Sequence, residues 1–515
     1  MRILLALLAL STVLTAAPQI SESKAISTFK KGFRGTRAKP PSVEQRRTAL
    51  KQLDGHDSKA VAKALVDAWL LLETEVNGLD ASRMEANAEL ADIIKGKEFD
   101  ANRVFPKAQF DRRRELIKLV DEQRQQVDAL REFQFALRAR IASVREPQSL
   151  SWLLDNVVGS KRHTIRLKIA VADAAGSLGE EMLEELSRAL LRAKQTQAVI
   201  ALLDGVGRVG SSARDCAPRI IGLLGHKDGA VRERAALALS RIAVAEAIEP
   251  MIDLLEREEG QARKRIAAAL EILTRQQFGD SIGSWRAWFE QEGSAYLSGT
   301  KLLGRGTPSN RERTNQKNYY FGIPQDGKSI LYVIDSSGSM KAPVDFNLGK
   351  TVAGGKSQMT RLEACKAELI RALGRLQPDK NFNIIWYSDL PHLYAKASSR
   401  ATKTNIQKGQ DWVRRLQPTS STNIHDSLQM GFSLTGRGSH DKHYGVAVDT
   451  VFLLTDGSPT KPDGKLDSTE KIVNAVRAWN PLKRVTIHCI GIGKGLNQGF
   501  LRQLASENGG EFKQY

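Results

Sequence analysis

Cysteine is scarce in this chain. Its three cysteines among 515 residues, Cys216, Cys365 and Cys489, lie far apart. Their odd number, and the absence of Cys-x-x-Cys or histidine-rich spacing, argue against a disulfide framework. Cys365 falls on the apolar side of a predicted helix and Cys489 lies within a predicted strand. We therefore expect both to be buried as small hydrophobic side chains.

Long apolar runs are also missing, apart from one at the start. Arg2 precedes an apolar run over residues 3–14, which the small residues TAA follow. This pattern predicts a secretory signal peptide over residues 1–17, because the run is short for a transmembrane helix. An uncleaved anchor is the alternative. We expect export to the periplasm or the cell exterior, no membrane span after cleavage, and a disordered linker at residues 18–42.

Acidic residues are fewer than basic ones. Lys and Arg number 77 against 58 Asp and Glu, which gives a formal net charge of +19. Such a balance favours nucleic acid, acidic polymers or anionic membrane surfaces as partners. The sequence contains no zinc-finger spacing, RNA-recognition string or helix-turn-helix pattern, so nucleic acid is not expected. An acidic protein or an acidic polymer of the cell envelope is the expected partner.

The length of the whole chain predicts two to four domains. The middle of the chain contains internal sequence repeats. Four similar stretches begin HTIRL, TQAVI, DGAVR and EGQAR; aligned on Ile165, Val199, Val231 and Ala262, they are 34, 32 and 31 residues apart. A period in the low thirties with paired helices is typical of an α-solenoid. The unit DGAVRERAALALSRI resembles a HEAT repeat. Residues 43–290 are therefore predicted to form a HEAT-like solenoid, with a plain helical bundle as the alternative.

Three further segments have their own patterns. Apolar residues at three-, four- and seven-residue steps predict a long helical hairpin at about residues 78–146, which either packs on the solenoid or pairs with a second copy. Residues 291–325 are polar with Gly and Pro, and are predicted to be a linker, with KNYYFGIP as an entry segment that packs on the sheet after it. Residues 341–358 have no periodicity and are predicted to be a mobile loop.

Residues 331–340 read LYVIDSSGSM, an apolar stretch that runs into a carboxylate and hydroxyls. A continuous apolar run is typical of a strand buried on both faces, and open α/β sheets bind ligands where such strands end. Asp335, Ser337 and Ser339 follow at alternate positions, as D-x-S-x-S. Carboxylate and hydroxyl oxygens are ligands for Mg²⁺, Ca²⁺ or Mn²⁺ rather than zinc. From these residues alone, a metal site and a serine-capped turn are both open.

Two later segments supply further oxygen-bearing residues. Thr422 lies in TSSTNIHDSL, and Asp456 follows the apolar stretch of TVFLLTDG. With Asp335, Ser337 and Ser339, they resemble the metal-ion-dependent adhesion site (MIDAS) of the von Willebrand factor type A (VWA) family. All five positions are filled in the family's order. The resemblance implies that these residues hold a divalent metal, Mg²⁺ or else Mn²⁺ or Ca²⁺.

Strand and helix patterns alternate over the same region, residues 326–515. The expected strands cover residues 329–334, 382–388, 450–454, 484–493 and the C-terminal GEFKQY, and the expected helices cover 361–377, 405–417, 423–432, 468–479 and 499–507. Such alternation predicts a doubly wound, mostly parallel sheet, the Rossmann-like fold of a VWA domain. The expected fold class is therefore multidomain: an N-terminal all-α solenoid and a C-terminal α/β VWA domain.

The resemblance implies a function in binding. A metal held largely by neutral hydroxyls keeps a coordination position for a partner's carboxylate, so the expected partner is a protein with an acidic side chain. The solenoid is expected to be a second binding scaffold. The alternatives are a structural scaffold with an idle metal site and a metal-assisted hydrolase of the cell envelope. The segment SSGSM is not a G-x-S-x-G elbow, and His425 has the position of a helix-start residue, so we expect no enzymatic activity.

Overall fold

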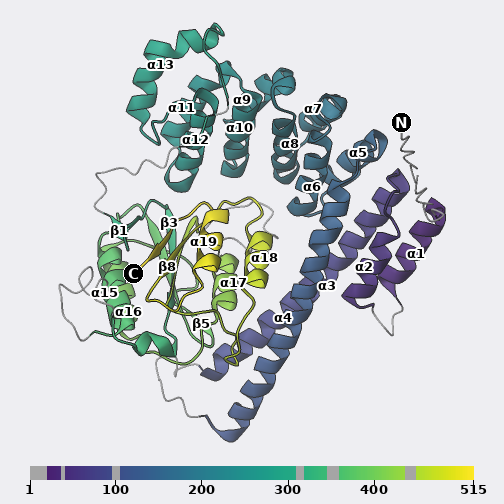
Figure 1. Ribbon diagram of the computed structural model, residues 1–515. Coiled ribbons are helices and arrows are strands. Elements are labelled where there is room, and N and C mark those ends of the chain that lie inside the picture. The colour runs from purple at the N-terminus through teal and green to yellow at the C-terminus, as the bar shows by residue number, and fades with distance from the viewer. Residues whose placement is uncertain are drawn as a thin grey trace, which may run out of the picture.

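Figure 1 shows the computed structural model of the chain. It describes residues 20–35, 41–94, 105–304, 306–308, 318–344, 359–434 and 448–515. The predicted signal peptide, and most of the predicted loop at residues 341–358, lie outside the described residues. A row of stacked helices lies beside an α/β unit, and a long pair of helices runs along the side of that unit (Figure 1).

The described residues before the α/β unit form helices. The α-helices are α1 (Glu22–Arg34), α2 (Val43–Lys51), α3 (Lys59–Ile94), α4 (Lys107–Ala142), α5 (Pro147–Leu153), α6 (Ile165–Gly176), α7 (Leu183–Arg192), α8 (Thr196–Val209), α9 (Ala217–Leu223), α10 (Gly229–Ile242), α11 (Ile248–Arg257), α12 (Gly260–Thr274) and α13 (Ile282–Leu297). A π-helical turn, Leu154–Val158, follows α5, and short 3₁₀ turns cover Gly179–Met182, Gly210–Cys216 and Ala245–Ala247.

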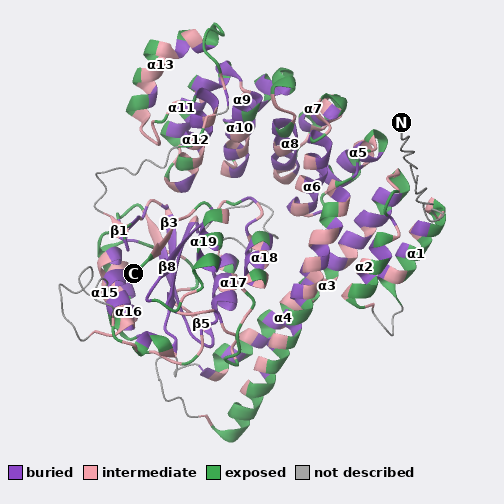
Figure 2. Ribbon diagram, viewed as in Figure 1, coloured by how far each residue is buried: buried purple, intermediate pink, exposed green. Residues whose placement is uncertain are grey.

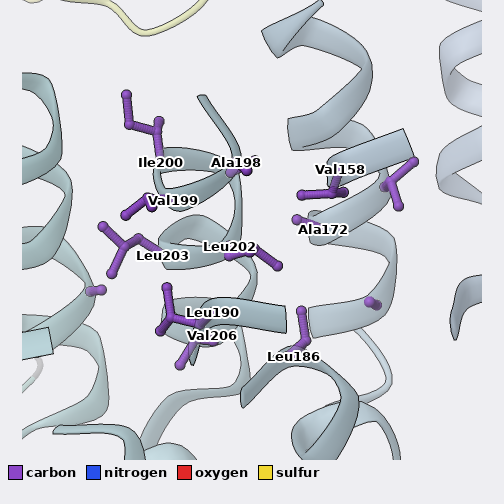
Figure 3. Close-up of a cluster of buried hydrophobic side chains, with 14 of the residues drawn as sticks. Val158, Ala172, Leu186, Leu190, Ala198, Val199, Ile200, Leu202, Leu203 and Val206 are labelled. Atoms are coloured by element: carbon purple, nitrogen blue, oxygen red, sulfur yellow. The ribbon is translucent and has the colours of Figure 1, made fainter. Parts of the chain in front are cut away.

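Helices α6, α8, α10 and α12 stack in sequence order, and α7, α9 and α11 each pack on the following member of that row. The alignment residues Ile165, Val199 and Val231 are all buried in this stack. In Figure 3, Leu202 of α8 points toward α6, which carries Ala172, whereas Val199 and Leu203 point to the opposite side. The predicted α-solenoid is therefore confirmed, with paired helices as its unit.

The predicted linker at residues 18–42 is wrong, because α1 occupies much of it. Ala25, Phe29 and Phe33 recur every four residues and are buried. Phe33 lies 5.8 Å from the ring of Phe133 on α4. The apolar stripe of α1 is short, and its helix is stable only because a distant segment covers it.

The predicted linker at residues 291–325 is also wrong at its start. Helix α13 continues to Leu297, since Tyr296 packs against Trp288 with ring centroids 5.2 Å apart. Near the other end, β1 (Tyr319–Tyr320) and β2 (Ile323–Pro324) form a small antiparallel pair. Tyr320 packs on the face of the main sheet, 5.2 Å from Tyr332, as the entry segment of the α/β unit.

The helical hairpin begins earlier in the chain than its predicted range of about residues 78–146. Its helices α3 and α4 have 36 residues each and lie side by side. The first half of α3 belongs to the helical core, where Trp69 and Leu72 are buried. Toward the residues that join the two helices, exposed surface increases (Figure 2). The hairpin therefore projects from the stacked helices and runs along the α/β unit.

The α/β unit contains a seven-stranded sheet with the order β5-β4-β3-β7-β8-β9, in which β6 also pairs with β4. Its strands are β3 (Ser329–Asp335), β4 (Asn381–Tyr387), β5 (Pro391–Leu393), β6 (Ser399–Arg400), β7 (Thr450–Thr455), β8 (Thr486–Gly491) and β9 (Phe512–Gln514). The pairs among β4, β3, β7, β8 and β9 are parallel, and β5 and β6 pair antiparallel with β4. The expected mostly parallel sheet is confirmed.

Helices cover both faces of the sheet. They are α15 (Arg361–Gly374), α16 (Lys403–Arg414), α17 (Ile424–Leu434), α18 (Thr469–Trp479) and α19 (Gln498–Glu507). Tyr332 and Ile334 of β3 join the apolar cluster on the α15 and α16 side, whereas Leu331 and Val333 join the cluster on the side of α17, α18 and α19. The apolar run therefore fills two cores. Cys365 and Cys489 are buried free thiols in these clusters, as expected.

A groove separates the stacked helices from the end of the sheet where its parallel strands begin. Its volume is about 1980 Å³, and its walls include Arg241 and Arg265 from the helices, and Lys483 and Glu511 from the α/β unit. The metal-site residues predicted from the sequence lie at the opposite end, where the parallel strands finish. The two ends of the sheet thus present different surfaces.

Candidate metal centre

Asp335 is the last residue of β3 and is fully buried. One of its carboxylate oxygens, Oδ1, accepts a hydrogen bond from the Ser337 backbone N–H at 2.7 Å, and Oδ2 accepts one from the Thr455 hydroxyl at 2.7 Å. Burial and the nearby Asp456 carboxylate raise the pKa of Asp335 to about 7. Both oxygens of Asp335 already accept hydrogen bonds from the protein. Asp335 can therefore stabilise a bound cation through its negative charge without contacting the ion directly.

Two serine hydroxyls lie beside this carboxylate. Ser337 Oγ and Ser339 Oγ are 3.0 Å apart, and the Ser339 hydroxyl donates to Asp456 Oδ1 at 2.6 Å. Neighbouring oxygen ligands of an octahedral Mg²⁺, bound at about 2.1 Å, are separated by about 3 Å. The spacing of the serine oxygens thus matches one edge of that octahedron. Ser339 is exposed whereas Ser337 is buried, so the site opens to solvent on the Ser339 side.

Thr422 comes from the segment before α17 and is held by the loop after β7. Its backbone N–H donates to Thr460 Oγ1 at 2.7 Å, and the Thr460 N–H donates to the Thr422 carbonyl at 2.9 Å. A methyl group built on Gly457 would lie 3.8 Å from Thr422 Oγ1 and 3.9 Å from Ser339 Oγ. Gly457 therefore lies directly beside Thr422 and Ser339, and the structure brings all five predicted residues to one place.

Three residues of this centre were missed from the sequence. Arg361, the first residue of α15, places Nη1 3.1 Å from Asp456 Oδ2. No local pattern indicates this contact, because it joins segments that are distant in the chain. Thr455 and Thr460 lie on either side of Asp456 in sequence, but Thr455 donates to Asp335 and Thr460 holds Thr422.

The donor set suits a hard divalent cation. It consists of two carboxylates and three hydroxyls, without nitrogen or sulfur, the chemistry that Mg²⁺, Mn²⁺ and Ca²⁺ prefer. Among the residues that the structure describes, no three His, Cys, Asp or Glu side chains gather as a metal site. The hydroxyls of Ser337, Ser339 and Thr422 are therefore essential to any metal centre here.

Two parts of the chain match known families. Residues 329–514 match the von Willebrand factor type A domain, and residues 183–271 match HEAT repeats. The chain carries a VWA domain and HEAT repeats. The resemblances expected from the sequence are thus confirmed. A VWA domain implies protein–protein interaction or adhesion, and VWA domains commonly bind a divalent metal at the MIDAS.

The relatives share the VWA domain. Inter-alpha-trypsin inhibitor heavy chain 4 of Mus musculus is 30% identical over 189 residues, which is 36% of this chain and 18% of that protein. The Homo sapiens heavy chain H3 is 28% identical over 214 residues, covering 40% of this chain and 22% of the other. The chain therefore matches only about a fifth of the length of these curated relatives.

Two solved structures are similar to about a third of the chain. The von Willebrand factor type A structure from Catenulispora acidiphila is 18% identical, covers 36% of this chain and 38% of the other, and has a TM-score of 0.29. Proximal thread matrix protein 1 of the mussel byssus is 22% identical, covers 36% and 41% respectively, and has a TM-score of 0.24. That mussel protein is described with a zinc-occupied MIDAS motif.

Proposed function

We propose that the chain is an exported interaction protein whose VWA domain binds an acidic group of a protein partner through a divalent metal. The observation that supports this most is the convergence of Ser337, Ser339 and Asp456, with a serine oxygen spacing of 3.0 Å that fits Mg²⁺. The same donor set also accepts Mn²⁺ or Ca²⁺.

The protein's part in this binding is to hold and orient the ion. Ser337, Ser339 and Thr422 supply neutral hydroxyl oxygens, and Asp335 and Asp456 supply the negative charge. A divalent cation bound there offers a Lewis-acidic position to a carboxylate oxygen of the partner. The exposed Ser339 lies on the side from which the partner approaches, while burial of Asp335 limits its contact with water.

The test is metal binding by the full chain. Isothermal titration with Mg²⁺ and Mn²⁺ should give one site for the natural protein and at least tenfold weaker binding for Ser339→Ala. Ser433→Ala, an exposed serine on α17 outside the centre, is the matched control and should leave the affinity unchanged. Equal affinities of the natural protein and Ser339→Ala would place the ion elsewhere and reject the proposal.

The partner is then sought by comparing binding in the presence and absence of the metal. An envelope fraction is passed over immobilised full chain with Mg²⁺ or with EDTA, and proteins eluted by EDTA are identified. A protein ligand is expected, and an acidic envelope polymer in the EDTA eluate would identify the alternative partner. Retention that EDTA does not change would contradict a metal-mediated contact.

We propose binding rather than catalysis. The histidine nearest in sequence to Thr422 is His425, which is fully buried, and its Nδ1 lies 2.8 Å from Asp426 Oδ1. Its ring packs edge-on against Trp479, and burial holds its pKa well below the ordinary value. These contacts support a structural role for His425. Hydrolysis of envelope polymers that depends on Mg²⁺ in the natural protein and is lost in Ser339→Ala would overturn this proposal.

We also propose that the HEAT repeats serve as a second binding scaffold. The groove of about 1980 Å³ beside α10 and α12 supports this, because it lies at the other end of the sheet from the metal centre. Binding there is expected to persist in EDTA. A partner that is retained by the Ser339→Ala variant as well as by the natural protein would use this surface.

Export is proposed from the sequence of residues 1–17. In the part of the chain that the structure describes, no helix combines the length and apolarity needed to cross a bilayer. Fractionation of cells that express the full chain, with mass spectrometry of its N-terminus, tests both export and cleavage. Recovery with an intact N-terminus in the cytosolic fraction would contradict the proposal.

A further inference from the structure

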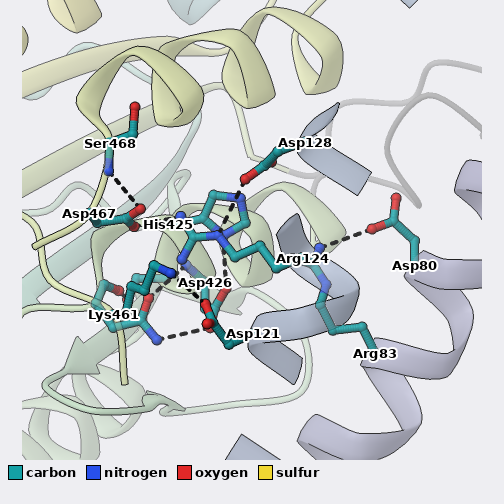
Figure 4. A network of polar contacts seen from close by, with 12 residues as sticks. Asp80, Arg83, Asp121, Arg124, Asp128, His425, Asp426, Lys461, Asp467 and Ser468 are labelled. Carbon is teal, nitrogen blue, oxygen red and sulfur yellow. Dashed lines mark hydrogen bonds and ion pairs between the residues drawn. The ribbon is translucent and has the colours of Figure 1, made fainter. Parts of the chain in front are cut away.

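Helix α4 contacts the VWA loops that surround the metal centre. Three ion pairs join them, with N–O distances of 2.5 Å for Arg113–Asp389, 2.8 Å for Asp121–Lys461 and 2.5 Å for Arg124–Asp467. Figure 4 shows the last two pairs, with α4 on one side and the VWA loops on the other. The three α4 residues lie on one side of the helix, given its 3.6-residue turn.

The charges alternate along this contact. Helix α4 presents a positive, a negative and a positive side chain, and the loops present the opposite sequence of signs. A shift of the helix along the loops would bring like charges together, so the pattern specifies one register. Between these pairs, Leu390 of the VWA domain packs against Leu90, Leu116 and Val120 of the hairpin. The contact is therefore specific, with Leu390 buried at its centre; the Arg124–Asp467 pair is buried, whereas the Asp121–Lys461 pair is partly exposed.

The loops that α4 contacts, after β4 and β7, also hold the metal-site residue Thr422 through hydrogen bonds. The Asn423 backbone N–H donates to the Ser388 carbonyl at 2.8 Å, and Asn423 Nδ2 donates to the Asp389 carbonyl at 3.0 Å. On the other flank, Thr460 exchanges two hydrogen bonds with Thr422. Thr422 thus lies between two loops, and α4 fixes each of them from outside, one through Asp389 and the other through the neighbour of Thr460, Lys461.

We propose that the α3–α4 hairpin is a positioning element for the metal centre. Docking of α4 holds the loops after β4 and β7 in the spacing that points the Thr422 hydroxyl at the cation. By thermodynamic reciprocity, metal binding then strengthens the docking of the hairpin by the same factor. Asp121 and Lys461 are the positioning residues, and they act through Thr460. This inference rests on the proposed metal-binding function.

The test compares two ion pairs between the helical region and the VWA domain, in the full chain. Asp121→Ala removes the pair beside Thr460. Glu259→Ala is the matched control, because it removes the pair with Lys328 at the other end of the strands. In metal-free protein, amide hydrogen exchange of residues 419–424 should be at least fivefold faster in Asp121→Ala than in the natural protein. Glu259→Ala should leave this exchange unchanged. The Mn²⁺ dissociation constant should rise three- to tenfold in Asp121→Ala and less than twofold in Glu259→Ala.

A charge swap separates positioning from a general loss of stability. Asp121→Lys combined with Lys461→Asp restores the pair with reversed signs, and it should recover both slow exchange and Mn²⁺ affinity. Unchanged exchange in Asp121→Ala, an exchange change without an affinity change, or equal effects of both single variants would overturn the inference. If the natural protein binds no Mn²⁺, the proposed function fails, whereas the exchange result still decides whether α4 positions Thr422.

Discussion

Asp456 lies between the Arg361 guanidinium and the proposed metal site. Its Oδ2 pairs with Arg361, and its Oδ1 accepts from Ser339 on the side of the proposed metal. Counted formally, two carboxylates and one guanidinium give the centre a charge of −1, which a divalent ion converts to +1. Without Arg361 the loaded centre would be neutral. We therefore expect Arg361 to weaken the binding of an ion at the proposed site but to make the loaded centre more attractive to a carboxylate.

Replacing Arg361 by Gln tests this balance. Loss of a positive charge close to the ion should tighten Mg²⁺ binding by about fivefold, or about 1 kcal/mol, allowing for screening at this partly exposed position. The melting temperature of the metal-free protein should fall, since buried Asp456 loses its counter-ion. Titration calorimetry and thermal unfolding with and without Mg²⁺ measure both effects. Arg375→Gln at the exposed end of α15 is the control; weaker Mg²⁺ binding in Arg361→Gln would contradict the expectation.

His488 on β8 is a buried residue with a measurable pH effect. Its Nδ1 accepts the Glu511 backbone N–H at 3.0 Å, and its ring stacks on Phe452. Burial lowers the pKa of His488 to about 4, Lys264 and Lys513 add to the lowering, and Asp326 opposes it. The folded protein therefore keeps His488 neutral at pH values where the unfolded chain, with a pKa of about 6.5, takes up a proton.

Stability should therefore decrease as the pH falls from about 6.5 toward 4. Because the unfolded state binds more protons in this window, protonation of His488 alone should lower the free energy of unfolding by about 2 kcal/mol between pH 6.5 and 5. Urea unfolding at several pH values measures it, and His488→Gln should flatten the profile. His226→Gln, where Nδ1 also accepts a backbone N–H but nearer the surface, should keep the natural profile. An unaltered profile in His488→Gln would show that other groups govern the acid response.

At the scale of elements, the solenoid depends on close approach of its helices. A Cβ on Gly205 of α8 would lie 2.6 Å from the carbonyl oxygen of Ala172 on α6, so even a methyl group requires the helices to separate. Gly205, the first of the three glycines in TQAVIALLDGVGRVG, is therefore a packing residue. Helix propensity would favour alanine at that position, and the tertiary contact overrides it.

Gly205→Ala should reduce the free energy of unfolding by about 2 kcal/mol or more, as expected for overpacking against backbone atoms. Gly222→Ala on α9 is the matched control, because a Cβ there meets no atom within 4 Å. The control should stabilise the protein by up to about 1 kcal/mol through helix propensity. Denaturant unfolding of both variants gives the comparison, and equal effects would mean that α6 and α8 adjust freely.

Elements with a strong local pattern were predictable, and those that need a distant partner were not. The strand β3 was predicted from LYVI because both of its faces are buried, which leaves no polar alternation. Helix α1 was missed, since its stripe of Ala25, Phe29 and Phe33 becomes a buried face only against α2, α3 and α4. The end of α13 was missed for the same reason, because Tyr296 is ordered by aromatic neighbours.

At the scale of the whole molecule, one buried carboxylate joins the HEAT repeats to the VWA domain. Glu233 on α10 lies 3.2 Å from Arg265 on α12 and 3.0 Å from Arg484, which precedes β8. Burial raises the pKa of Glu233, but the two arginines lower it overall. The ion pairs therefore keep it charged at neutral pH and hold the two domains together.

Glu233→Gln should weaken that connection. Two arginines would lose their counter-charge, so the free energy of unfolding should fall by about 3 kcal/mol. Scanning calorimetry is expected to show the transitions of the two domains moving apart, because less free energy couples them. Glu249→Gln on the exposed side of α11 serves as the control. A single unshifted transition in Glu233→Gln would mean that other contacts carry the coupling.

The sequence by itself determined the alternation of the main strands and helices of the VWA domain, the two domain types and the identity of five oxygen-bearing residues. These follow from periodicity and from short motifs, which depend on neighbours in the chain. Only the tertiary structure decided that Arg361 pairs with Asp456, that α1 is a helix, and that α4 clamps the loops around Thr422. Such contacts join residues far apart in the chain, and their energy depends on burial and distance, which no local pattern records.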